Sequence, residues 1–512
     1  MQFPKFQKYW PLFILVLTIY IIVFYLTLIG FYLLSSTLID HVEPQIVSVS
    51  WLNQRGEILY HAVEAESRYN NLLYGPMLYL IVGIFLKLLS PSVFAAKLPI
   101  AIALYSSLVF LFFAFRQTVS RFWSLLAIAL LCLIILATGN IVGIPLFYVR
   151  SDALIFCCIS WLLWIVKKQH RPWVTVITVG LGIAIAINLK ITAILYFIPI
   201  LYLVYLQLNL QAIAAILGVS LIFSLLPFGL PTISWHNYLE LLQLTRQHGI
   251  SWSFFCQNLM MVTVLFLPMM IASFHLHQIP SDRGKHFWHK HRFYFYSLAI
   301  ASLGTAIIAA KPGAGPHHLL PYLPLICDLT LRIMAQLTSS PKTLPLRQAN
   351  LLLLLEIILI VFLLLKGLTN GIIWLESTQG RGEKVIRDLQ EILTRYPQQT
   401  LQMGYGENNN YSSTFYRFIL VFQDRPYLFD AMAVMDFQFA NQPLSDRTLE
   451  YIATCQTEIW LIPQGDSPFL QPNYYPPSAL LFSDSFRETF QNTYQKVDRS
   501  QFFDIWQCRP SP

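Results

Sequence analysis

Long apolar segments separated by short polar loops are the feature that most constrains the fold of this chain. A helix needs about 20 apolar residues to cross the hydrocarbon core of a bilayer, and most of these segments approach that length. Only 12% of the 512 residues are charged, about half the usual share of soluble domains. The pattern predicts a polytopic α-helical membrane protein, with apolar segments at about 10–34, 72–89, 93–115, 122–138, 151–166, 173–189, 191–208, 212–230, 254–275, 293–310, 319–337 and 350–370.

Basic residues add a constraint on topology, because Lys and Arg are enriched in the cytoplasmic loops of membrane proteins. The net charge is +8, but the cations lie mostly in short loops, so they indicate topology rather than nucleic-acid binding. Lys5 and Lys8 place the N-terminus in the cytoplasm. If segment 72–89 does not span, every other basic cluster also lies inside: Arg116/Arg121, Lys167/Lys168/Arg171, Arg283/Lys285/Lys290/Arg292 and Lys342/Arg347.

We therefore predict a juxtamembrane or re-entrant helix at 72–89 and about eleven spans. The N-terminus is expected in the cytoplasm and the C-terminus outside the cytoplasmic (inner) membrane. Residues 1–374 then form the transmembrane domain, with a first outer loop at 35–71.

The apolar runs stop at about residue 375, and the pattern changes. Residues 383–396 are amphipathic, whereas 458–462 and 502–506 are typical of strands. We predict an extracytoplasmic α/β domain at 375–512. It contains Cys455 and Cys508, and outside the cytoplasm the two can form a disulfide; the sequence does not decide whether they pair.

The first outer loop contains the strongest candidate for a general base. Glu43 follows the first apolar segment, where a carboxylate at the membrane surface could accept a proton from a hydroxyl group. Asp40 lies nearby, and residues 47–52 can form a short surface helix. The alternative is an ordinary solvated loop residue, which is our interpretation of Glu57, Glu64 and Glu66.

Other polar residues are predicted to lie on the same outer side. Arg150 and Asp152 open one span, where they could also cap a helix. Lys190 interrupts about 36 apolar residues and must either reach the interface or pair with an anion. Lys311 precedes a Gly/Pro-rich turn that could hold a phosphate group or be a plain turn, and that turn ends with His317 and His318.

Six short motifs in order resemble the GT-C superfamily of membrane glycosyltransferases. The resemblance is to bacterial protein O-mannosyltransferases and aminoarabinose transferases, that is, to enzymes similar to dolichyl-phosphate-mannose-protein mannosyltransferases. The chain departs from the family pattern at three points. The frequent Asp-Glu pair is Val42-Glu43 here, the Pro-Pro pair is Gly75-Pro76, and the Asn of the last motif is a histidine. The motifs are at 40–60, 73–79, 96–99, 150–152, 188–190 and 311–321.

The resemblance implies an inverting transfer of a hexosyl or pentosyl group from a polyprenyl-phosphate donor to a glycan, lipid or protein hydroxyl. Glu43 would be the base, with Asp40 as the second candidate. Donor phosphate and substrate contacts would come from Arg150, Asp152, Lys190, Lys311, His317 and His318. We expect no metal and no other cofactor, because these cations can hold the leaving phosphate, and no nucleic-acid partner.

Two other classes remain open at the level of sequence. A transporter or lipid-linked-sugar flippase would also have about eleven spans and buried cations. A ligase or polymerase of surface polysaccharide would share the polyprenyl-linked donor. The long first loop and the large outer domain favour the transferase.

Overall fold

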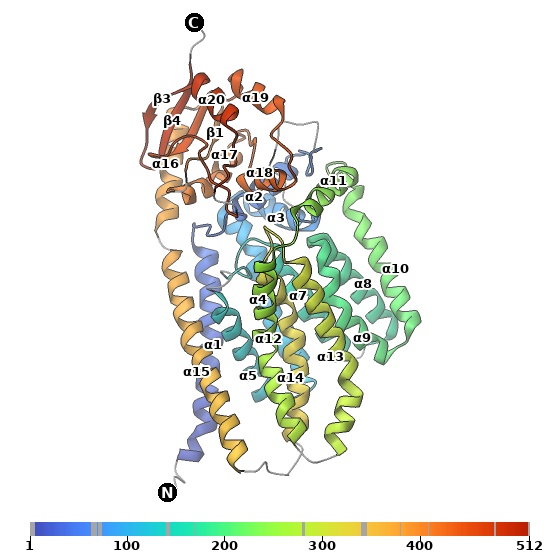
Figure 1. Ribbon diagram of the computed structural model, residues 1–512. Coiled ribbons are helices and arrows are strands. Elements are labelled where there is room, and N and C mark those ends of the chain that lie inside the picture. Colours follow the sequence, from blue (N-terminus) through green and yellow to red (C-terminus); the bar gives the residue numbers. More distant parts are fainter. Residues whose placement is uncertain are drawn as a thin grey trace.

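A bundle of long helices carries a small sheet at one end, and the chain's N-terminus lies near the other end (Figure 1). The computed structural model describes residues 6–62, 69, 74–139, 144–168, 170–278, 282–338, 346–378, 380–407, 409–475 and 478–509. The predictions about Glu64, Glu66 and Lys342 fall outside these residues, as do the side chains of Arg283, Lys285 and Arg347. We call the two ends of the bundle the sheet end and the opposite end.

The long helices coincide with the predicted apolar segments. In lipid every backbone polar group must be paired within the protein, and a helix pairs them within one segment. Among the described residues, seven helices are long and apolar enough to cross a membrane, as expected of a multi-pass membrane protein; the count of about eleven crossings stays a prediction. The helices are α1 (Phe6–Leu34), α4 (Val93–Arg116), α5 (Arg121–Ala137), α7 (Ser151–Lys168), α8 (Pro172–Leu189), α9 (Ile198–Gln207), α10 (Leu210–Leu225), α12 (Trp252–Gln278), α13 (Asp282–Ile308), α14 (Leu323–Thr338) and α15 (Leu346–Ser377).

Two shorter helices lie at the sheet end, beneath the C-terminal region: α2 (Glu43–Gln54) and α3 (Pro76–Leu89) (Figure 1). The 14 residues of α3 span only about 21 Å at 1.5 Å per residue, less than the hydrocarbon core of about 30 Å. This length fits the predicted juxtamembrane helix at 72–89. The predicted surface helix at 47–52 is part of α2, but it packs under the C-terminal region, where Trp51 contacts Phe422.

Proline and lysine break the helical pattern at the sheet end. Lys190 has an extended backbone and separates α8 from the 3-10 helix η1 (Ile191–Phe197). The predicted segment 319–337 begins as a second 3-10 helix, η4 (Pro316–Tyr322), which contains Pro321. These irregular segments bring polar side chains to the sheet end. The chain between α10 and α12 adds η2 (Leu226–Gly229), α11 (Trp235–Thr245) and η3 (Arg246–His248).

The C-terminal region contains a four-stranded sheet with the order β1-β2-β4-β3. Its first pair, β1 with β2, is parallel and the other two pairs are antiparallel. The central strand β2 is buried along its whole length, including Trp460. The predicted helix and both predicted strands are present, whereas the domain boundary at 374/375, inside α15, stays a prediction. The elements are α16 (Arg381–Arg395), β1 (Leu401–Met403), η5 (Tyr411–Tyr416), α17 (Phe418–Phe422), α18 (Ala431–Phe439), α19 (Asp446–Ala453), β2 (Ile459–Pro463), α20 (Asp484–Thr493), β3 (Tyr494–Arg499) and β4 (Phe503–Cys508).

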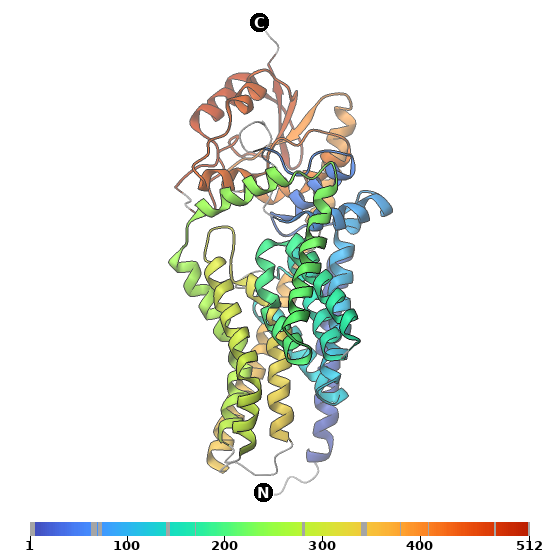
Figure 2. The same ribbon diagram turned by 90° about the vertical axis from the view of Figure 1, so that its right-hand side faces the viewer.

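The first loop is tied to this region by backbone hydrogen bonds. Tyr69 donates its N–H to the Leu428 carbonyl at 2.8 Å, and its own carbonyl accepts from Asp430 at 2.6 Å. The view in Figure 2, turned by 90° from Figure 1, shows the helices of the sheet end directly below the sheet. The first loop and the C-terminal region therefore form one surface over the end of the bundle.

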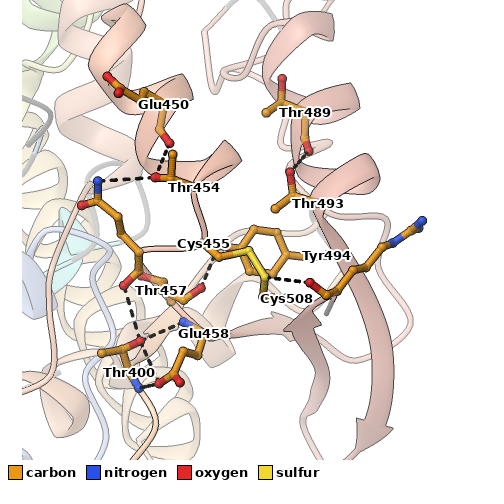
Figure 3. Close-up of a disulfide and its surroundings, with 12 residues drawn as sticks. Thr400, Glu450, Thr454, Cys455, Thr457, Glu458, Thr489, Thr493, Tyr494 and Cys508 are labelled. Carbon is orange, nitrogen blue, oxygen red and sulfur yellow. Dashed lines mark hydrogen bonds between the residues drawn. A yellow bond between two sulfur atoms is a disulfide. The ribbon is translucent and has the colours of Figure 1, made fainter. Parts of the chain in front are cut away.

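A disulfide joins Cys455 to Cys508, which answers the question that the sequence left open. Cys455 follows α19, and Cys508 ends β4 (Figure 3). The Cys508 N–H also donates to the Glu458 carbonyl at 3.0 Å. The disulfide therefore links the end of β4 to the turn that precedes β2.

Replacing Cys455 with serine should destabilise the C-terminal region by about 4 kcal/mol, the entropic value for a closed loop of this size, since the two cysteines are 53 residues apart. Thermal unfolding of the full chain checks the loss, and alkylation with mass analysis checks the pairing. Cys256→Ser is the matched control, because Cys256 is a free, exposed cysteine. Equal stability of the two variants would contradict the prediction.

Candidate active site

The predicted site residues meet at the sheet end of the bundle, although they come from four separate segments. Asp40 lies in the loop after α1, and Arg150 lies just before α7. Asp152 is in the first turn of α7, Lys190 caps α8, and His318 is in η4. All five side chains are largely buried. The convergence predicted from topology is therefore present for these residues.

Asp40 and Arg150 form the first ion pair of the site. The Arg150 Nε donates to Asp40 Oδ2 at 2.6 Å, and the His41 Nδ1 lies 3.4 Å from Oδ1. Burial would raise the pKa of Asp40, but the charges of Arg150 and His41 outweigh it and hold that pKa below its usual value. Burial opposes the charge of Arg150, yet Asp40 raises the pKa of Arg150 overall. Both groups are therefore charged at neutral pH.

Lys190, Asp152 and His318 form a second group beside the first. The Lys190 Nζ lies 3.9 Å from Asp152 Oδ1 and 3.0 Å from His318 Nε2. Among the described residues, no hydrogen-bond partner is present for the other buried oxygen of Asp152, Oδ2. The Tyr196 hydroxyl donates to the backbone carbonyl of His318 at 2.8 Å and fixes η4. Asp152 therefore offers one oxygen to Lys190 and has a second available to a ligand.

Gly75 allows the chain before α3 to pack against the end of α8. A Cβ atom on Gly75 would lie 2.1 Å from the backbone oxygen of Asn188. The Gly75 N–H donates to the Leu189 carbonyl at 3.1 Å. The preceding residue, Tyr74, has its ring centroid 5.8 Å from the Lys190 Nζ. The glycine that departs from the Pro-Pro motif thus has a steric reason in this chain.

Glu43 is fully buried and has donors on both carboxylate oxygens. Oε2 accepts from the backbone N–H groups of Ile39 and Asp40, each at 2.9 Å. Oε1 accepts from the Val149 N–H at 2.8 Å and from the Tyr32 hydroxyl. Burial raises the pKa of Glu43, and the nearby Asp40 charge acts in the same direction. The Glu43 carboxylate thus joins the loop that carries Asp40 to the loop that carries Arg150.

A buried lysine, Lys97, binds the backbone of the loop that carries Asp40. The Lys97 Nζ donates to the backbone carbonyls of Tyr32, Ser35 and Thr37 at 2.9, 2.9 and 2.6 Å. It also lies 3.7 Å from the centroid of the Tyr32 ring. A cation at the C-terminal end of a helix interacts favourably with its carbonyl groups. Lys97 therefore holds the end of α1, from which the Asp40 loop starts.

Lys311 lies toward the C-terminal region, whereas His317 lies among the charged residues of the site. The rings of His317 and His318 are tilted against each other with centroids 4.5 Å apart. Burial lowers the pKa of His317 to about 3, so its imidazole is neutral at neutral pH. Lys311 is partly buried and interacts electrostatically with Asp436; burial lowers the pKa of Lys311 in spite of that charge. Within the part of the chain that the structure describes, neither residue forms a hydrogen bond to Arg150 or Lys190.

Asp436, which α18 contributes from the C-terminal region, was not among the residues predicted from the sequence. The His248 Nε2 lies 3.1 Å from its backbone oxygen and 3.9 Å from Oδ1. Burial and the charge of Asp430 raise the pKa of Asp436 to about 8, against the effect of Lys311. The carboxyl group is therefore mainly protonated at neutral pH and can donate a hydrogen bond. An acidic residue inside the apolar run 431–440 was the available signal.

Metal-binding groups are the last feature of the site. Within the part of the chain that the structure describes, no group of three or more His, Cys, Asp and Glu side chains could hold a metal ion. The expectation that no metal or cofactor takes part stays a prediction.

No family model matches the chain, and no curated protein matches it by sequence. ArnT from Cupriavidus metallidurans, solved in complex with undecaprenyl phosphate, is a structural neighbour with 13% identity and a TM-score of 0.57, over 96% of this chain and 97% of that one. The oligosaccharyltransferase of Archaeoglobus fulgidus with a tethered acceptor peptide has 11% identity and a TM-score of 0.51, over 98% and 74%.

Both neighbours are GT-C proteins, and the match to ArnT covers both chains almost completely. The present chain therefore has the fold of the GT-C membrane glycosyltransferases, with a small C-terminal sheet. This confirms the fold that the six motifs predicted.

Proposed function

We propose that this protein is a membrane glycosyltransferase that moves a sugar from a polyprenyl-phosphate donor to an acceptor hydroxyl group. The observation that carries the proposal is the buried pairing of two cations, Arg150 and Lys190, with two carboxylates, Asp40 and Asp152. Such a group can bind a phosphate and accept a proton within one site. The fold supports it, because ArnT, a structural neighbour, was solved with undecaprenyl phosphate.

Arg150 and Lys190 would stabilise the phosphate as it leaves the sugar. Negative charge grows on the leaving oxygen in the transition state, and cations held in a buried site stabilise it more strongly than cations in water. The Arg150 guanidinium can form two parallel hydrogen bonds to a phosphate. Asp152 would orient Lys190 with one oxygen and accept a substrate hydroxyl with the other.

We assign the role of general base to Asp40, and to Glu43 the role of a positioning residue. Glu43 is fully buried and its oxygens already accept four hydrogen bonds, two of them from the backbone of Ile39 and Asp40. Asp40 is slightly exposed and ionised. When a donor phosphate binds Arg150, Asp40 loses part of that ion pair and becomes a better proton acceptor. The sequence-based choice of Glu43 stays the competing prediction.

The acceptor would approach from the side of the C-terminal region. Lys311 and Asp436 lie on that side, and a protonated Asp436 can donate a hydrogen bond to a sugar or acceptor oxygen. Deprotonation of the acceptor by Asp40 and departure of the phosphate would be one displacement, with inversion at the anomeric carbon. We further propose that the site lies on the outer face of the cytoplasmic membrane, with the N-terminus inside.

The test is transfer by the purified full chain in liposomes, with a panel of undecaprenyl-phosphate sugars and products identified by mass spectrometry. Mass analysis of glycans and lipids from a deletion strain supplies the acceptor. A new glycosidic bond with release of undecaprenyl phosphate supports the proposal. Movement of the donor across the vesicle with no new bond would show a transporter or flippase instead.

A further inference from the structure

A basic pocket of about 540 Å³ lies at the opposite end of the bundle, away from the candidate active site. It is formed by the start of α13, the last turns of α14 and the loop after α4, near the end of the molecule where the N-terminus lies (Figure 1). Its walls contain the cations of Lys290 and Arg332, the imidazoles of His286 and His291, and the aromatic ring of Phe287. Three uncharged residues complete the lining: Thr118, Ala335 and Gln336.

The pocket is supported by a buried ion group with an excess of positive charge. Asp328 is fully buried and accepts from Arg332 Nε at 2.8 Å and from the Lys167 Nζ. The Lys167 Nζ also donates to Thr118 Oγ1 at 2.6 Å. One carboxylate therefore faces two cations. Lys290 adds a third cation, and none of the described lining residues is acidic.

Arg332 is held in place rather than free on the surface. Its Nε is engaged by Asp328, and its guanidinium carbon lies 5.8 Å from the centroid of the Tyr294 ring. Within the residues that the structure describes, its two Nη groups form no hydrogen bond, so they can bind an acceptor at the pocket. A guanidinium in a fixed orientation suits the paired oxygens of a phosphate.

We propose that this pocket binds a phosphate group, carried either by an anionic lipid headgroup or by a soluble phosphate. The lining supplies guanidinium, ammonium and imidazole donors around a cavity large enough for one headgroup. Phe287 and Ala335 provide apolar wall, which a glycerolipid can contact beside its phosphate. The site is separate from the Asp40–Arg150 site, so the proposal does not depend on the catalytic assignment.

The test compares two charge reversals on the same end of the protein. Lys290→Glu changes an exposed lysine of the pocket, whereas Lys168→Glu changes an exposed lysine that does not line it. The full chain is placed in phosphatidylcholine nanodiscs with a small fraction of phosphatidylglycerol, and native mass spectrometry counts bound phosphatidylglycerol. In a second arm without phosphatidylglycerol, inorganic phosphate is titrated and the thermal midpoint is measured.

A hydrogen bond between charged groups strengthens binding by about tenfold or more, so Lys290→Glu, which removes such a contact from the pocket, should reduce phosphatidylglycerol retention by about tenfold or more. Lys168→Glu should retain it like the original chain. A thermal shift by inorganic phosphate that Lys290→Glu abolishes would identify soluble phosphate as the ligand. If the two variants behave alike in both arms, the proposal is overturned.

Discussion

Replacing Asp40 with asparagine should reduce the turnover of glycosyl transfer by about 10²- to 10⁴-fold, the range for loss of a general base. Asparagine keeps the shape of the side chain and can still contact Arg150, but it cannot accept the proton of an attacking hydroxyl. The asparagine amide oxygen can accept the hydrogen bond from Arg150 Nε, which is 2.6 Å from Asp40 Oδ2 in the original chain. The variant leaves the buried Arg150 charge uncompensated, so the rate is expressed per amount of folded protein. The measurement is the initial rate in the liposome assay with saturating donor.

Glu43→Gln separates the two candidate bases. The glutamine amide would place its NH₂ group against backbone N–H donors of Ile39 and Asp40 or of Val149. A buried group that loses its partners costs about 1–3 kcal/mol, so a lower thermal midpoint is expected together with a smaller loss of rate. Asp424→Asn, in an exposed pair with Arg55, is the matched control and should change neither.

Glu43 would be the base if the results were reversed. In that case Glu43→Gln would lose glycosyl transfer with an unchanged thermal midpoint, and Asp40→Asn would keep glycosyl transfer. Both variants must be quantified in the membrane fraction, so that a loss of protein is not counted as a loss of catalysis.

The helices were predictable because their signal is local. Each apolar segment can be recognised from its own residues. The short segment 76–89, which begins with a proline, was predicted not to span because only then do all the basic loops lie on the cytoplasmic side. Lys190 could be placed at an interface for the same reason, since a lysine between two apolar runs has few other positions. Topology then grouped Asp40, Arg150 and Lys190 at one end of the bundle.

The contacts that distinguish Glu43 from Asp40 could not be predicted in this way. The Val149 N–H that binds Glu43 is 106 residues away in the chain. The four donors around Glu43 exist only after α1, α2 and the loop before α7 have packed together. Asp436 was missed for a similar reason, because its position beside Lys311 depends on how the C-terminal region sits over the bundle.

The second large expected effect is the loss of turnover when the charge of Lys190 is removed. Lys190→Met keeps the length of an unbranched side chain but removes the charge near the leaving phosphate. Loss of one electrostatic contact to a transition state typically costs about 10²- to 10³-fold in turnover. The variant also leaves Asp152 buried without its cation, 3.9 Å away in the original chain. Asp152→Asn combined with Lys190→Met removes that unpaired charge, so the double variant should recover stability but not rate.

The pH dependence of transfer distinguishes catalysis from simple packing. Burial lowers the pKa of Lys190 to about 8, although Asp152 opposes the shift. The charged form is therefore present below about pH 8 and is lost as the pH rises, so the rate should decline above that value. Lys190→Arg stays charged throughout this range and should remove the decline, even if its rate is lower. A decline that persists in Lys190→Arg would mean that a different group titrates, and that the Lys190 ammonium does not limit transfer at alkaline pH.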